Sequence, residues 1–166
     1  MSAIASLYVL DRERAVELAD LAGRTSWWAR LTRSSAGFDR NAAFFEVLVE
    51  HARPVRPGYE WSGNCMLALL AYLQRRGVRL RRSDLKAESS AINRVYGETL
   101  LLTSVHKKYL DKLAPEAHRE DQIRAYFEKE RLGFEEAGIA AMDGLELLHD
   151  ALSRLQRDEV LLLNVG

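Results

Sequence analysis

The chain begins and ends on short apolar runs, and this constrains its fold more than any other feature of the sequence. Residues Ala3–Leu10 and Val160–Val165 are rich in β-prone apolar side chains, which is the pattern of buried strands. A third such run covers Glu98–Thr103, and the pattern between the three runs is mostly helical. Because a buried strand needs partners for its backbone groups, the two terminal runs are the best partners for each other. We therefore expect an α+β fold, with a small sheet that includes the N- and C-terminal strands and is covered by several helices.

Capping and breaking residues set the expected bounds of these helices. Asp11 is suited to cap a first helix that Gly23 would end, and Asp39 is suited to cap a second helix over residues 41–52. Residues 24–37 show no sustained period, so the sequence leaves their conformation open. Further helices are expected near residues 63–76, 83–94, 103–113, 118–131 and 135–157.

The composition is that of a single domain. A chain of 166 residues, 48% of them hydrophobic, is long enough to bury a core without disulfides or metal, so residues 1–166 are expected to form one globular domain. Its one cysteine, Cys65, cannot form a disulfide within the chain, which makes a reducing cytoplasm the expected location. No apolar run approaches the roughly 20 residues that cross a bilayer, and no signal-peptide pattern opens the chain, so no membrane role is expected.

Charge is balanced overall but uneven along the chain. The formal net charge is zero, which argues against a nucleic-acid binder. Residues 1–115 carry 18 basic and 12 acidic residues, whereas residues 116–166 carry 6 basic and 12 acidic residues. We interpret the two parts as complementary surfaces, which meet within the fold or across a homodimer. In the alternative interpretation, the arginine run at residues 75–82 is a patch that binds an anion or a protein partner.

The segment that precedes the most apolar helix is the best candidate for a binding site. Pro54 and Pro57 predict a loop ahead of this segment. The predicted binding residues follow and are Tyr59, Glu60, Trp61 and Asn64. Aromatic side chains near loop glycines offer a large contact area, and packing alone does not explain a carboxylate between two aromatics. A pocket lined by these side chains competes with a simpler interpretation, in which the aromatics anchor the core.

Cys65 and His149 are the candidates for chemistry. A thiol near a helix N-terminus can ionise more readily, and His106, His118 or His149 would then serve as base. The competing interpretation is that Cys65 is a buried core residue, because it opens a nearly all-apolar helix. His149 also forms a Glu-x-x-His pair with Glu146, a spacing used in helical carboxylate metal sites, but those sites need further ligands that this sequence does not supply. No metal and no cofactor are expected.

The two ends of the chain resemble the YfbM-like bacterial domains of unknown function. The opening Met1–Ile4 with its apolar strand, Asp11 and an amphipathic helix looks like the start of those domains. They also close with a long helix, a short turn and an apolar strand, as Glu135–Gly166 does here. The part between these ends, with Trp61 and Cys65, does not align. The resemblance implies a small bacterial cytosolic α+β domain, and it transfers no site residue.

Two functional hypotheses follow from these patterns. The first is a non-enzymatic interaction or ligand-binding module, such as an accessory or immunity-type protein, because the sequence contains aromatics clustered in one segment and no catalytic motif. The alternative is a small hydrolase or transferase that uses Cys65 with a histidine.

Overall fold

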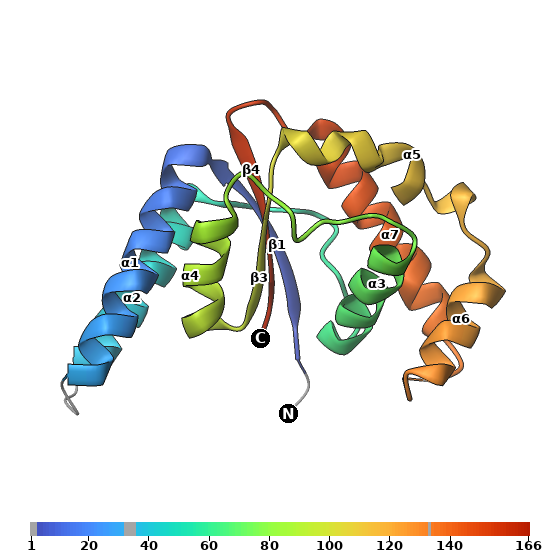
Figure 1. Cartoon of the computed structure of the whole chain (residues 1–166), viewed down its shortest axis with the longest axis horizontal. Helices are drawn as coiled ribbons and strands as arrows, with labels where there is room; N and C mark the ends of the chain where they lie inside the picture. Colours follow the sequence, from blue (N-terminus) through green and yellow to red (C-terminus); the bar gives the residue numbers. More distant parts are fainter. Residues whose placement is uncertain (1–2, 32–35, 133) are drawn as a thin grey trace.

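A four-stranded antiparallel sheet forms the middle layer of the molecule (Figure 1). The computed structural model describes residues 3–31, 36–132 and 134–166, and it describes their side chains except in 24–31 and 36–43. The strands are β1 (Ala5–Asp11), β2 (Arg53–Pro54), β3 (Glu98–Leu102) and β4 (Glu159–Val165), in the order β2-β1-β4-β3. The prediction that the terminal runs pair is confirmed, since β1 and β4 lie side by side from Ala5↔Val165 to Asp11↔Glu159.

Helices cover both faces of this sheet. One face carries α1 (Arg12–Leu31), α2 (Ala36–His51) and α4 (Lys86–Tyr96), and the other carries α3 (Gly63–Arg75), α5 (Leu110–Leu113), α6 (Glu120–Lys129) and α7 (Ala137–Arg154) (Figure 1). Two 3₁₀ turns, η1 (Ser104–Tyr109) and η2 (Pro115–Ala117), flank α5. None of the helices among the described residues combines the length and the apolarity that crossing a bilayer requires.

The strand β4 shows why the terminal runs are almost continuously apolar. Successive side chains of a strand point to opposite faces of the sheet. Leu161 and Leu163 accordingly join the core shared with α3 and α7, whereas Val160 and Leu162 join the core shared with α1 and α4. Because helices cover both faces of the sheet, the side chains on both faces of β4 are apolar. The strand therefore lacks the alternation of polar and apolar residues that is typical of a strand with one face in solvent.

Three local predictions are wrong. The first helix does not end at Gly23 but continues to Leu31. A glycine inside a helix costs only about 1 kcal/mol relative to alanine, so Gly23 alone does not end it. Asp39 lies inside α2 rather than at its start, since that helix is already formed at Ala36. The predicted loop at Pro54 contains the two-residue edge strand β2; proline is tolerated there because an edge strand leaves some N–H groups unpaired. The indefinite stretch at residues 24–37 is helical wherever its backbone is described.

The outer edge of β3 is closed by side chains of α4. Ser89 Oγ donates a hydrogen bond to the Thr99 carbonyl at 2.6 Å, and the Thr99 N–H donates to the side-chain carbonyl of Asn93. Gly97 makes the tight turn from α4 into this strand, with φ of 84°. These contacts satisfy backbone groups that would otherwise offer the edge to another strand.

Candidate functional site

A cleft of about 670 Å³ opens between α7 and the segment Arg53–Trp61, which crosses from the layer of α2 to the layer of α3 (Figure 1). Its lining residues are Val9, Arg53, Val55–Trp61, Asp143, Glu146, Leu147, Asp150, Ala151, Arg154, Leu155, Gln156 and Glu159. Three of the predicted binding residues, Tyr59, Glu60 and Trp61, therefore share one cavity.

Tyr59 anchors the crossing segment to α7. Its side chain is only 8% exposed, and its hydroxyl donates to the Ala140 carbonyl at 2.9 Å. Burial raises the pKa of the Tyr59 hydroxyl above its ordinary value, so the group stays protonated and keeps this bond. Gly144 leaves room for the approach, since a Cβ there would lie 3.3 Å from Cε2 of Tyr59 and 2.6 Å from Cδ2 of Leu69. The role of Tyr59 is thus to hold the wall of the cleft in place, because little of its side chain is exposed to a ligand.

Trp61 lies near Tyr59 on this wall and is held by a carboxylate. Its indole Nε1 donates to Asp143 Oδ2 at 2.7 Å. The ring lies 6.2 Å from that of Phe134, measured between centroids, at an interplanar angle of 40°. Because the indole is only half-buried, part of it remains available to a bound molecule.

The other wall is one face of α7. Asp143, Glu146 and Asp150 are spaced three and four residues apart, which places their side chains in a row along the helix. Leu147 and Ala151 belong to the same face and contribute apolar surface between the carboxylates. In the sequence, Glu146 and Asp150 stand out only as neighbours of His149. The feature that could have predicted their place in a site is the row of carboxylates along an otherwise apolar helix.

Half of the charged groups in the cleft neutralise one another. Arg53 pairs with Glu159, and Arg154 Nη2 lies 3.3 Å from Asp150 Oδ2. The side chains of Arg56, Glu60 and Glu146 have no hydrogen-bond or ion-pair partner within the described part of the chain. Charges left free on the wall of a cavity are available to a ligand.

Asn64, Cys65 and His149 are not brought into the cleft. Asn64 is exposed in the first turn of α3, where its backbone N–H donates to Ser62 Oγ at 3.3 Å. Cys65 is only 2% exposed, and burial raises the pKa of its thiol, which keeps it in the form that is not nucleophilic. No hydrogen bond joins this thiol to a histidine among the described residues. His149 is partly exposed, with Nδ1 3.5 Å from Asp150 Oδ1.

Comparisons with known proteins give no relative. No family model, no curated protein and no solved structure matches this chain. The resemblance of the chain ends to the YfbM-like domains thus stays a prediction, and the site has to be interpreted from its own geometry.

Metal binding is not supported by the arrangement of donors. Within the residues that the structure describes, no three or more His, Cys, Asp or Glu side chains are placed to hold one ion together. Glu146 and His149 remain a single pair on α7, which is short of the ligand sets that helical metal sites use.

Two arginines of the run at residues 75–82 form ion pairs, each with a different part of the chain. Arg75 Nη2 lies 3.2 Å from Glu130 Oε1, which directly follows α6, and Arg81 pairs with Glu98 on β3. The first pair joins the basic part of the chain to its acidic part.

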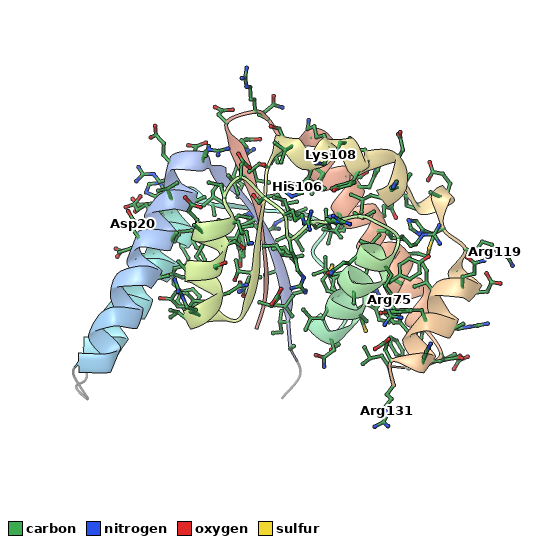
Figure 2. The ribbon with its side chains drawn as sticks, viewed as in Figure 1. Asp20, Arg75, His106, Lys108, Arg119 and Arg131 are labelled. Atoms are coloured by element: carbon green, nitrogen blue, oxygen red, sulfur yellow. The ribbon has the colours of Figure 1, made fainter. Side chains whose placement is uncertain are left out.

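His106 is the most deeply buried titratable group that has a polar atom without a partner. Its side chain has no exposed surface, and Nδ1 lies 3.0 Å from the Thr103 backbone nitrogen. The other ring nitrogen, Nε2, is buried without a hydrogen-bond partner among the described residues. Figure 2 shows His106 in the interior, whereas Arg119 and Arg131 point outward. Burial lowers the pKa of His106 more than its backbone contacts raise it, so the folded protein holds the neutral form.

We expect the stability of the protein to fall as the pH drops below about 6.5, the ordinary value for histidine. The folded-state pKa values of His106 and the nearly buried His118 are both lowered by desolvation, so the unfolded chain takes up protons first. The full stability is present above the unfolded pKa, and each such group removes at most about 1.4 kcal/mol per pH unit below it. Urea unfolding at pH 7.5 and 5.5 measures this loss. His106→Gln should flatten the dependence, and an unchanged slope in that variant would contradict the assignment to His106.

Proposed function

We propose that the protein is a non-enzymatic ligand-binding module, and that the cleft between α7 and the segment Arg53–Trp61 is its binding site. One observation carries the proposal: a cavity of about 670 Å³ combines apolar surface with charged side chains that have no partner among the described residues. Small-molecule sites are typically cavities of about 300–1,000 Å³ with an apolar lining and a few polar groups. Both the size and the lining of this cleft agree with that description.

A small ligand fits the cleft better than a flat protein surface does. A stable protein interface buries about 800 Å² on each partner and has an apolar centre. The cleft is instead concave and carries free charges on its walls. We propose that the protein acts as an accessory protein when the ligand is bound. The free thiol of Cys65 supports a reducing cytoplasm as the location of the protein.

Recovery of small molecules from a cell extract tests this function. The purified protein is incubated with a deproteinised bacterial extract, washed by gel filtration and denatured, and the released compounds are identified by mass spectrometry. Trp61→Ala opens one wall of the cleft, whereas Phe45→Ala removes an exposed aromatic side chain from α2, which covers the face of the sheet opposite to α7. We expect compounds to be enriched by the wild type and Phe45→Ala, and at least about tenfold less by Trp61→Ala, a loss of about 1.4 kcal/mol.

Circular dichroism and thermal unfolding establish that both variants are folded before the comparison. A second cleft variant, Glu146→Gln, changes only a charge that has no partner in the described structure and so preserves the fold. Equal enrichment by all four proteins, or no enrichment by the wild type, would overturn the proposed function.

A further inference from the structure

The charges in the cleft indicate which class of molecule it binds, and this inference rests on the proposed function. When the two ion pairs are set aside, the lining retains the carboxylates of Glu60, Asp143 and Glu146 and only one guanidinium, that of Arg56. Asp143 accepts its hydrogen bond from a neutral indole, so its negative charge is not cancelled. The cleft therefore has an excess of negative charge that the protein itself does not balance.

The uncancelled carboxylates lie at one end of the cleft. The bond from Trp61 to Asp143 fixes this end, Glu60 is the chain neighbour of Trp61, and Glu146 lies one helical turn beyond Asp143. The paired arginines belong to the other end, where Arg53 meets Glu159 at the start of β4. The segment Arg53–Trp61 and α7, which form the two walls, run antiparallel between these ends. The apolar surface therefore lies between one end that is acidic and aromatic and another end where most charges are paired.

The indole of Trp61 adds a second feature that favours a cation. The π-face of tryptophan attracts ammonium and guanidinium groups more strongly than that of any other side chain. This indole is only half-buried and bonds to Asp143, and Glu60 and Glu146 line the same cleft. The same end of the cleft thus offers both kinds of group that recognise organic cations.

The apolar surface shows that the cation is attached to an apolar body. Val55, Leu147 and Ala151 line the cleft beyond its acidic end, and a hydrated inorganic ion would leave this surface in contact with water. The described carboxylates also do not converge as a metal-binding set. A molecule with a cationic head and an alkyl chain matches both parts of the lining.

We propose that the ligand of this cleft is an organic cation, an ammonium or guanidinium group on an apolar chain, whose charged head lies between Glu60, Glu146 and the ring of Trp61. The same chemistry is found in free amines and in the basic side chains of peptides. Recognition through the charged head and the chain predicts that charge, and not shape alone, decides which molecules bind.

Three probes of equal chain length and different charge test this proposal. Pentylammonium, pentanol and pentanoate are titrated into ¹⁵N-labelled protein at low salt, and the indole N–H signal of Trp61, assigned with Trp61→Phe, reports binding. We expect saturable binding of pentylammonium, at least about tenfold weaker binding of pentanol, and none of pentanoate. Spermidine and a blocked pentapeptide with one arginine between leucines then distinguish a free amine from a peptide side chain as the source.

The variants separate a built site from a general attraction of cations to acidic surfaces. Glu60→Gln and Glu146→Gln should each weaken pentylammonium binding at least about fivefold, whereas Glu128→Gln, which removes an exposed carboxylate from α6, should leave it unchanged. Equal losses in all three variants, or preferred binding of pentanoate or pentanol, would overturn the cation proposal. In that case small molecules recovered from extract by the wild type and not by Trp61→Ala would still uphold the proposed function, so that the two proposals fail separately.

Discussion

Replacing Gly97 with alanine is expected to lower the free energy of unfolding by about 3 kcal/mol. The backbone of this residue has φ of 84° and ψ of −172°, a region that is essentially reserved for glycine. A Cβ at this position would also lie 2.8 Å from the Val165 carbonyl oxygen, closer than van der Waals contact allows. Because that oxygen belongs to the backbone of the central strand β4, neither atom can move away without disturbing the sheet.

Gly23→Ala is the matched control for this substitution. Gly23 lies inside α1, and a Cβ there would meet nothing within 4 Å. Alanine should therefore stabilise the helix by up to about 1 kcal/mol through its higher helix propensity. Urea unfolding of the three proteins measures both effects, and a Gly97→Ala protein as stable as the wild type would show that the turn into β3 is described incorrectly.

Removing the side chain of Tyr59 is expected to cost about 3–4 kcal/mol of stability, within the range seen when buried aromatics are truncated to alanine. Tyr59 is nearly buried between the crossing segment and α7, and its ring lies against Gly144. Tyr59→Phe keeps the ring and loses only the bond to the Ala140 carbonyl, so it should cost about 1 kcal/mol.

The two Tyr59 variants also separate support of the cleft from contact with its ligand. If Tyr59 acts by fixing the wall, Tyr59→Phe should bind pentylammonium as the wild type does, whereas Tyr59→Ala should lose binding together with stability. Denaturant unfolding and the NMR titration, performed on the same samples, give both quantities. A Tyr59→Phe protein that is stable but does not bind would mean that the hydroxyl itself contacts the ligand.

The pairing of the terminal strands was predictable because it follows from a local pattern and one general requirement. Continuous apolar runs of this length form strands buried on both faces, and two such runs at the ends of a chain satisfy each other's backbone groups. The ends of α1 and α2 were predicted wrongly because Gly23 and Asp39 are only local signals. Burial of the apolar face of a helix outweighs the preference of one residue for a cap or a break.

The site was predictable only in part. Tyr59, Glu60 and Trp61 stand out in the sequence because they combine aromatic and acidic groups in a loop, and all three line the cleft. Asn64 is only three residues further along, but α3 has begun at Gly63 and the residue lies outside the cleft. The acidic face of α7 could not be assigned to the same site, because no sequence pattern shows which side of that helix packs against a segment more than 80 residues away.

If the cleft is where ligands bind, its backbone amides should respond to bound molecules, and a map of NMR shift changes detects that response. A mixture of small organic fragments, with cationic, neutral and anionic members, is added to ¹⁵N-labelled protein of known backbone assignment. We expect the largest changes at the amides of residues 55–61 and 143–155 and at the indole N–H of Trp61. Largest changes on α1, α2 or α6, with the amides of the cleft unaffected, would show that the cleft is not the binding site.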